Sequence, residues 1–328
     1  MPCLLFLRRR ATPSAVIVIL ALFLLPVRSM ANHGPGASGG GSAVISGETL
    51  NQGKIELSLR EDYTQFERFG ETDAAARAAK SGDFDALERG FLTTVDVAYG
   101  VTDEFQLGAS IGYFVGDNFV SADRAEDGSV EVGTADPQGL TDLVLSGKYR
   151  LLRGQPGNLA VVGGVVVPTG RDDVRVSSGE TIHPSDQPGT GRWGLPIGVG
   201  YSRFLTKQLT IDASALYTFR FERDDFKVGD RFDAGVALAY RLTQSIRKFP
   251  QFSVFGEVNN VWLQKDREDG ADDPNSGGDI LYLTPGLRVR FDPHTALTVA
   301  PSFPVVQNLN GEQGEVKFKV AVALTYAL

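Results

Sequence analysis

The chain has 328 residues, a formal net charge of −8 at neutral pH, 42% hydrophobic residues and one cysteine. An acidic chain is a poor candidate for binding nucleic acid, because it has no excess of Lys and Arg to replace the counterions of the phosphates. A single cysteine also excludes an intrachain disulfide framework.

The N-terminus has the features of a secretory signal. Arginines at 8–10 precede an apolar run at 15–25, and the small residues at 29–31 suit a signal peptidase. A membrane anchor helix, the alternative, needs ~20 apolar residues, and this run is much shorter. We therefore predict a signal peptide over 1–31. Its removal takes away the only cysteine and four arginines, so the formal net charge moves from −8 to −12.

The segment that follows, 32–52, is rich in Gly and Ser and has few large apolar residues. Such a composition predicts a flexible leader. The pattern changes at Lys54, where apolar and polar residues begin to alternate with a period of two, which is typical of a half-buried strand and not of a helix.

Segments of this kind recur along the rest of the chain. We predict twelve strands, near 53–66, 90–99, 105–115, 140–152, 158–168, 192–204, 209–220, 232–241, 251–264, 279–291, 296–306 and 315–328. Short connections alternate with long polar ones from the first strand to the last. This alternation is typical of outer-membrane barrels, which have short periplasmic turns and long external loops.

The predicted fold class is therefore all-β, a transmembrane up-and-down antiparallel β-barrel of about 12 strands over 53–328, located in the bacterial outer membrane. Each strand is about as long as the ~9–11 tilted residues that cross the hydrocarbon layer. The sheet must close, because an open edge would leave backbone groups unpaired in lipid. Aromatic residues near both ends of the strands predict two interfacial girdles. A soluble β-sandwich, the alternative, requires neither the girdles nor an export signal.

The last strand, 316–328, has apolar residues at every second position. We expect it to pair with the first strand and to close the barrel. Its alternation resembles the C-terminal signal that the barrel-assembly machinery recognises, with Leu328 where that signal usually has phenylalanine. The expected partners are thus this machinery, outer-membrane lipid and lipopolysaccharide, and an unidentified small solute.

Several stretches resemble one known group of proteins: "GLTDLVLSGKYRLL" (139–152), "NLAVVGGVVVPTG" (158–170), 189–219 and "FGEVNNVWL" (255–263). Together they are similar to the outer-membrane transporters associated with meta-pathway phenol degradation. The first stretch departs from the group at Thr141, where a glycine is expected. The resemblance implies a barrel that passes small hydrophobic or aromatic solutes.

The alternation places charged side chains on the inner wall of the barrel. The pore-lining candidates are Asp142, Lys148, Arg150, Glu257, Arg288 and Arg290, together with the apolar positions Phe255 and Tyr282. These side chains could line a narrow constriction that selects solutes by charge and size. Alternatively, they could form a packed network of ion pairs that fills a narrow barrel.

We therefore expect a passive channel for small, partly apolar solutes, without a cofactor. The alternative is a non-conducting barrel that acts through its external loops as an adhesin, a receptor or a structural protein. An outer-membrane lipid-modifying enzyme is not expected, because the only plausible nucleophile and base are Ser177 or Ser178 beside His183.

Two long loops carry further features. Asp266, Asp269, Asp272 and Asp273 lie among glycines and are a weak candidate for calcium, although a solvated acidic loop explains them as well. Residues 72–90 have a helical composition and could cap the mouth of the barrel or lie on its outside.

Overall fold

The structure is a computed structural model that describes residues 41–328 except 126 and 155. The predicted signal peptide, 1–31, and the first part of the predicted leader, 32–40, lie outside the described residues.

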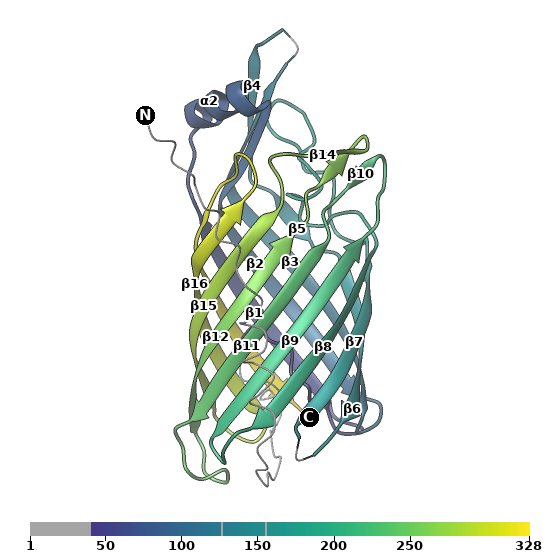
Figure 1. Cartoon of the computed structure of the whole chain (residues 1–328), viewed down its shortest axis with the longest axis vertical. Coiled ribbons are helices and arrows are strands. Elements are labelled where there is room, and N and C mark those ends of the chain that lie inside the picture. Colours follow the sequence, from purple (N-terminus) through teal and green to yellow (C-terminus); the bar gives the residue numbers. More distant parts are fainter. Residues whose placement is uncertain (1–40, 126, 155) are drawn as a thin grey trace, which may run out of the picture.

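Twelve long strands of the described chain form a closed antiparallel barrel (Figure 1). They are β1 (Ile55–Phe66), β2 (Asp83–Gly100), β3 (Phe105–Arg124), β6 (Leu143–Leu152), β7 (Asn158–Val167), β8 (Gly194–Phe204), β9 (Leu209–Arg220), β11 (Arg231–Arg241), β12 (Gln251–Leu263), β15 (Gly278–Arg290), β16 (Thr295–Leu309) and β17 (Val316–Ala327). Neighbours in the chain pair throughout, and β17 also pairs with β1, where Leu57 lies opposite Tyr326. The predicted fold and the closure by the last strand are confirmed.

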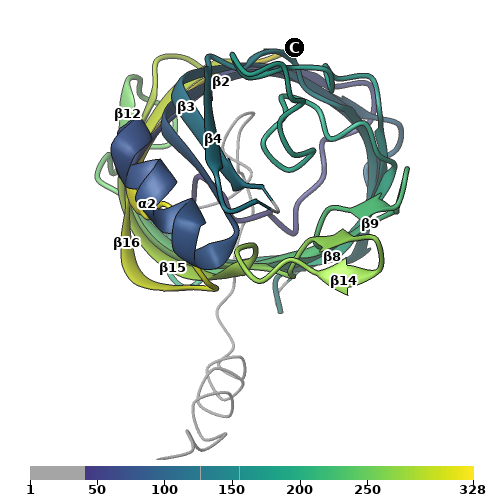
Figure 2. The ribbon, with the colours of Figure 1, turned by 90° about the horizontal axis from the view of Figure 1, so that it is seen from above.

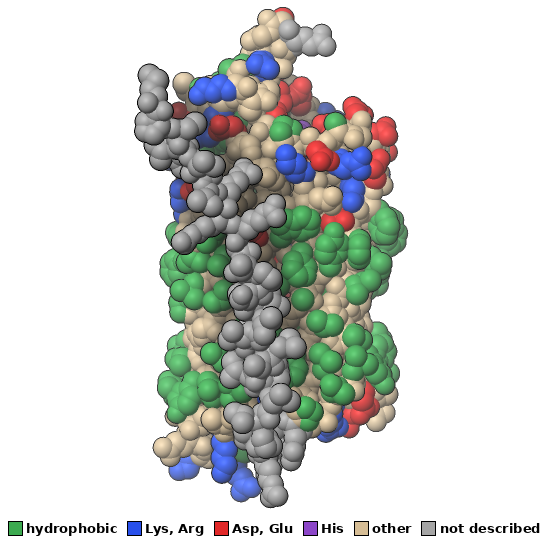
Figure 3. Space-filling model, in the orientation of Figure 1, with side chains coloured by type: hydrophobic (Ala, Val, Ile, Leu, Met, Phe, Trp, Pro, Cys, Tyr) green, Lys and Arg blue, Asp and Glu red, His purple; other side chains and the backbone are tan. Residues whose placement is uncertain are grey.

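A belt of apolar side chains covers the middle of the outer wall (Figure 3). Odd-numbered residues of β2, such as Val95 and Val97, are 46% and 41% exposed, which is the behaviour of a wall that faces lipid. Exposed aromatic residues mark the two edges of the belt. Those near the short turns are Tyr99, Tyr149, Tyr240, Phe252, Phe291 and Tyr326, and those near the long loops are Phe91, Tyr113, Trp193, Phe219, Trp262 and Phe303. The barrel therefore spans the outer membrane. Among the described residues, no helix has the length and apolar character to cross a membrane.

The long connections after β1 and β3 are more ordered than the sequence predicts. Strands β2 and β3 continue beyond the aromatic edge as a pair, and β3 also pairs with β4 (Val130–Ala135) and with β5 (Gln138–Leu140) (Figure 1). The helix predicted within 72–90 is α2 (Glu71–Ser81). The prediction is wrong for the second half of that range, because the residues from Asp83 onward belong to β2.

Helix α2 packs on this extension and lies at the rim of the barrel in the view from above (Figure 2). Its buried residues, Ala74 and Ala78, contact Phe84 and Ala122. Small alanines permit this close approach, and the apolar strand residues gain burial away from the membrane. A second small sheet at the same end consists of β10 (Phe226–Lys227), β13 (Arg267–Glu268) and β14 (Ala271–Asp272).

The described part of the predicted leader lies inside the barrel, and its trace runs within the ring of strands in the view from above (Figure 2). The backbone N–H of Ile45 donates to Ser214 Oγ at 3.0 Å, and the N–H of Gly47 donates to Ser202 Oγ at 2.9 Å. The sequence predicts a flexible leader here, whereas residues 41–50 are hydrogen-bonded to the wall. The Gly/Ser composition fits the narrow lumen because it adds little side-chain bulk; the flexibility of the leader as a whole stays a prediction.

Candidate functional site: the outer vestibule and the lumen

The connection between β7 and β8, residues 168–193, folds inward over the lumen, and we term it the roof loop (Figure 2). Asp142, which lies between β5 and β6, holds both ends of it. Its carboxylate accepts hydrogen bonds from the backbone N–H of Gly170 at 3.0 Å and from the N–H and Oγ1 of Thr190, each at 2.8 Å. One wall carboxylate thus joins the entry and the exit of the loop.

The neck of the roof loop is narrow because glycines face each other across it. A Cβ added at Gly170 would lie 2.6 Å from the Cα of Gly189, closer than real Cβ contacts. The N–H of Gly189 donates to the carbonyl of Arg171 at 2.9 Å. Glycines are therefore required at this crossing.

The body of the roof loop has its own apolar core. Val174, Val176 and Ile182 pack with Phe119 of the β3 extension, whose side chain is 1% exposed. Gln187 is buried and bridges this core, because its amide donates to the carbonyls of Val174 and Ile182 at 3.1 Å. Ile182 and Gln187 are both held in this core, and the residues between them, His183–Asp186, form a short turn.

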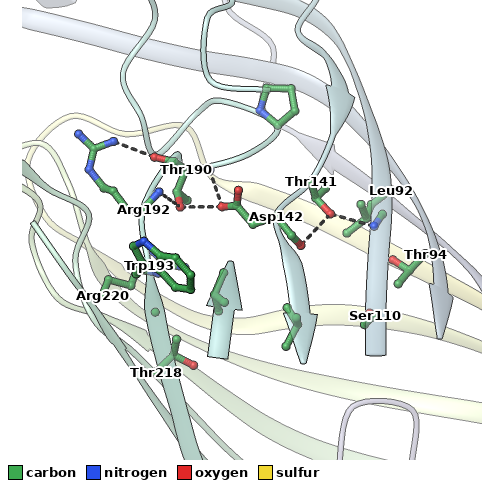
Figure 4. A pocket seen from close by; sticks show the side chains of 15 residues that line it. Leu92, Thr94, Ser110, Thr141, Asp142, Thr190, Arg192, Trp193, Thr218 and Arg220 are labelled. Atoms are coloured by element: carbon green, nitrogen blue, oxygen red, sulfur yellow. Dashed lines mark hydrogen bonds between the residues drawn. The ribbon is translucent and has the colours of Figure 1, made fainter. Parts of the chain in front are cut away.

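Beneath the exit of the roof loop lies a cavity of about 300 Å³ inside the barrel, which we term the inner cavity (Figure 4). Its wall mixes apolar side chains with hydroxyls from facing strands. Lining residues include Leu92, Thr94, Ser110, Asp142, Val144, Val166, Thr190, Arg192 and Thr218. Such a wall suits a small solute that is partly apolar and partly polar.

A larger cavity of about 530 Å³, the outer cavity, lies at the long-loop end. It combines apolar residues from the strand ends with carboxylates from the loops. Its lining includes Phe66, Leu87, Phe114, Ile280 and Leu309, and also Asp83, Asp85, His183, Asp186, Asp266 and Asp273. Burial raises the pKa of Asp85 to about 6 and that of Asp186 to about 7.

The two cavities adjoin each other. Leu92, Thr141, Pro188 and Arg220 line both of them. Pro188 belongs to the roof loop and the other three to the wall or its end, so the boundary between the cavities is formed where the loop meets the barrel. A solute that enters from the long-loop side would meet first the outer and then the inner cavity.

Deeper in the lumen, residues 41–50 lie inside the ring of strands (Figure 2). Glu257, which is 1% exposed, accepts a hydrogen bond from the N–H of Ser42 at 2.6 Å. The guanidinium of Arg288 donates to the carbonyl of Gly41 at 3.0 Å, and that of Arg60 donates to the carbonyl of Ser42 at 2.8 Å. Wall charges therefore satisfy the backbone of an extended segment that has no partner strand.

The eight pore-lining candidates do not form one ring. Asp142 lies at the outer end with the roof loop. Glu257 and Arg288 lie at mid-height with the N-terminal segment, and the Arg288 guanidinium is 5.7 Å from the ring centre of Phe255. Tyr282 is nearby on β15, where the Lys319 amine lies 4.7 Å from its ring centre.

The remaining three candidates lie toward the short turns. Arg150 donates to the carbonyl of Asp103 at 2.6 Å, Lys148 lies opposite Gln106 across β3 and β6, and Arg290 lies opposite Gln251 across β12 and β15. The candidates thus occupy three levels of the lumen, and Asp142, Glu257 and Arg288 each bind chain segments that lie within it.

Sequence reasoning missed the partners of these residues. Thr190 and Ser202 had no distinguishing signal, because a hydroxyl residue in a loop or a strand is common. The alternation of the strand placed Asp212, which is fully buried, on the inner wall. The sequence did not indicate that its carboxylate accepts a hydrogen bond from Ser202.

Neither the weak calcium candidate nor the Ser–His pair, which was not expected to act as an enzyme site, is brought together by the loops. Among the described residues, no group of three or more His, Cys, Asp or Glu is placed to hold a metal ion, so the proposed calcium ligands do not converge. One of them, Asp266, instead accepts from the N–H of Gly229 at 2.6 Å. His183 faces Asp85, at 3.9 Å between Nδ1 and Oδ2, whereas Ser177 bonds to Thr134 of β4.

Comparisons with known proteins agree with the architecture. Among solved structures, the chain is similar to the COG4313 outer membrane channel from Pseudomonas putida F1, with 13% identity and a TM-score of 0.54 over 90% of this chain and 100% of that chain. It is more distantly similar to the toluene transporter TodX from Pseudomonas putida, with 9% identity and a TM-score of 0.42 over 92% of this chain and 99% of that chain. For the CymD monoaromatic hydrocarbon channel the identity is 12% and the TM-score 0.39, over 85% and 89% of the two chains.

A search of curated proteins found no match. The similarity to the COG4313 outer membrane channel supports the shared barrel fold. A family model described as "Putative MetA-pathway of phenol degradation" matches residues 35–303. The match covers more than half of the chain and confirms the resemblance that the sequence motifs indicated, so the chain belongs to this family of proteins associated with phenol degradation.

Proposed function

We propose that the protein is a passive outer-membrane channel for small, partly apolar solutes, which enter through the outer cavity and continue into the inner cavity. The observation that carries this proposal is the adjoining pair of cavities inside a closed transmembrane barrel, with apolar residues and hydroxyls on the same wall. A wall of this kind offers an aromatic solute both van der Waals contact and hydrogen bonds.

The size of the barrel supports a narrow path. Twelve strands enclose much less space than the ~16–18 strands of general porins. The roof loop and residues 41–50 reduce that space further, because both lie inside the ring of strands. The family description concerns phenol degradation, which supports small aromatic compounds as the class of solute.

The eight candidate residues have separate proposed roles within this channel. Asp142 holds the roof loop that bounds the inner cavity. Glu257 and Arg288 hold the N-terminal segment at mid-height, and Phe255 and Tyr282 supply apolar surface there. We assign Lys148, Arg150 and Arg290 to the wall of the periplasmic end.

We also infer that the protein is not an enzyme. A lipid hydrolase of the outer membrane requires a nucleophile and a base in contact at the membrane boundary. The Ser177 side chain is bonded to β4 and the His183 imidazole faces a carboxylate, so the only pair suggested by the sequence is engaged elsewhere.

A second function, adhesion or partner binding, is favoured by one observation. The β2–β3 extension, β4 and α2 form an ordered arm with its own apolar core beyond the membrane belt (Figure 1). Conduction separates the two functions, because a barrel that acts only through this arm needs no open path.

Uptake into liposomes tests the channel directly. Liposomes that contain the reconstituted full-length protein should accumulate benzoate faster than protein-free liposomes and should exclude sucrose, which is bulkier. Rates equal to those of protein-free liposomes would contradict the proposal.

A further inference from the structure

The turn of the roof loop that faces the outer cavity brings an imidazole and two carboxylates together. His183 Nδ1 lies 3.9 Å from Asp85 Oδ2 of β2, and Asp186 follows in a turn that is closed by its own N–H and the His183 carbonyl at 2.9 Å. All three line the outer cavity, which adjoins the inner cavity. Neither the family nor the channel function accounts for a titratable group of this kind at the entrance.

We propose that Asp85, His183 and Asp186 form a pH-sensitive charge switch at the outer mouth, which favours cations at mildly alkaline pH and loses that preference in acid. The inference rests on the proposed channel function and deepens it, because it states which charge of solute enters. Rings of charged side chains set ion selectivity in other pores by the same electrostatics.

The surroundings of the switch hold it in place. The centre of the His183 ring lies 5.8 Å from the centre of the buried Phe226 ring. The Arg192 guanidinium lies 5.1 Å from the centre of the Phe226 ring as well. The residues on either side of the turn, Ile182 and Gln187, are anchored in the core of the roof loop. A change of protonation therefore alters the charge at a fixed position in the mouth.

Other charged groups surround the switch. The acidic ones are Asp83 of β2, Asp123 of β3, Glu268 of β13, and Asp266 and Asp273 of the β12–β15 connection. In addition, Glu312 of the β16–β17 connection lines the same cavity and is paired with Arg77. The cavity is also lined by two arginines, but Arg231 is paired with Asp233 and Arg220 donates to the carbonyl of Gly229 at 3.1 Å. Acidic groups thus outnumber basic ones around the switch.

The sign of the pH response follows from these neighbours. Burial raises the pKa of Asp85 to about 6 and that of Asp186 to about 7. Burial alone would lower the pKa of His183, but the carboxylates of Asp85 and Asp186 outweigh it and raise that pKa. Both carboxyl groups therefore lose protons between pH 5 and 8.5, His183 loses its proton at a pH above its ordinary value, and the summed charge of the three groups becomes more negative as pH rises.

The test uses two aromatic ions whose charges do not depend on pH. Liposomes with the full-length protein are given benzyltrimethylammonium and benzenesulfonate at pH 5, 6, 7 and 8.5, and the ratio of the two uptake rates is measured. We expect this ratio to rise roughly three- to tenfold over the range at low ionic strength, and less in high salt because exposed charges are screened.

Variants give opposite shifts that a general loss of structure would not produce. The double variant Asp85→Asn/Asp186→Asn should lower the ratio at pH 8.5 well below the wild-type value at that pH, because it removes two negative charges. His183→Gln should raise the ratio at pH 5, because it removes the positive charge. Asp127→Asn, an exposed carboxylate outside the cavity that bonds to Ser129, is the matched control and should follow the wild type. Heat-modifiable migration in gels verifies that each variant forms a barrel.

A second measurement reads the switch without transport. Histidine NMR signals of the protein in nanodiscs should place the pKa of His183 above its ordinary value, and Asp85→Asn should lower it. A wild-type uptake ratio that stays flat from pH 5 to 8.5 while both ions enter would overturn the switch and leave the channel intact. A His183 pKa that Asp85→Asn does not change would also overturn the switch. No entry of either ion at any pH would overturn the channel itself, and the switch with it.

Discussion

Thr190 donates two hydrogen bonds to one oxygen of Asp142, from its backbone N–H and from its hydroxyl, each at 2.8 Å. The two residues are separated by 48 positions in the chain and belong to the roof loop and the barrel wall. This contact decides where the inward loop ends and therefore forms one side of the inner cavity.

The Asp142 contact should control the order of the roof loop. Asp142→Ala removes three hydrogen bonds to a carboxylate, and such bonds contribute about 1.5–3 kcal/mol each. We expect amide exchange at Gly170 and Thr190 to be at least tenfold faster. Asp173→Asn is the matched control, because Asp173 is exposed and bonds to Arg171 within the same loop. Equal exchange rates in the wild type and Asp142→Ala would refute the role of the anchor.

The N-terminal segment should limit conduction. A Cβ at Gly47 would lie 2.1 Å from the carbonyl oxygen of Asn158, so Gly47→Val cannot be accommodated in the lumen without displacing the segment. We expect a larger single-channel conductance with an unchanged barrel. Gly70→Ala is the control, since the only atom near its new Cβ lies 3.9 Å away. A conductance of Gly47→Val equal to that of the control would show that the segment does not restrict the path.

The turn that carries His183 should be more stable in acid than in base. A carboxyl group whose pKa is raised in the folded state favours folding at low pH and loses that contribution as pH rises through the raised value, here about 7 for Asp186. The raised pKa of His183 acts in the same direction. Amide exchange of the turn, corrected for the intrinsic pH dependence, should therefore be faster at pH 8.5 than at pH 5.5; the reverse order would contradict the assignment.

Removal of the last three residues should prevent assembly. Tyr326 pairs with Leu57 of β1 and with Thr295 of β16, and the N–H of Leu328 donates to the carbonyl of Ile55 at 2.8 Å. Truncation before Tyr326 shortens the pairing of β17 with both β1 and β16 and removes part of the predicted assembly signal. The truncated chain should give no heat-modifiable band in membranes, whereas Leu328→Phe should assemble normally. Wild-type amounts of folded truncated protein would refute this prediction.

The barrel could be predicted from the sequence because one face of every strand meets lipid. A period of two recurs wherever that constraint applies, and in β9 and β12 the predicted bounds match the structure to within one residue. The constraint ends at the membrane edge. There, the alanine-rich sequence before Phe84 indicated a helix that continued too far, because apolar residues of β2 pack on α2 instead of lipid.

The lumen could be predicted only in part. The alternation of polar and apolar residues identified Asp142, Glu257 and Arg288 as lumen residues, but it did not indicate what they bind. A Gly/Ser-rich segment has the same composition whether it is free in solution or held in a lumen. Its position depends on contacts such as that of Gly47 with Ser202, which are 155 positions apart and form only once the barrel closes.

The central claim, that solutes pass through the inner cavity, is tested most directly by filling that cavity. Ser110 lines it, whereas Val95 lies on the lipid side of the neighbouring strand and is 46% exposed. In single-channel recordings with liposome uptake of benzoate in parallel, we expect the wild type and Val95→Trp to conduct equally. Ser110→Trp should reduce both signals at least fivefold while the barrel stays heat-modifiable. Equal conduction and uptake by all three proteins would contradict a path through this cavity.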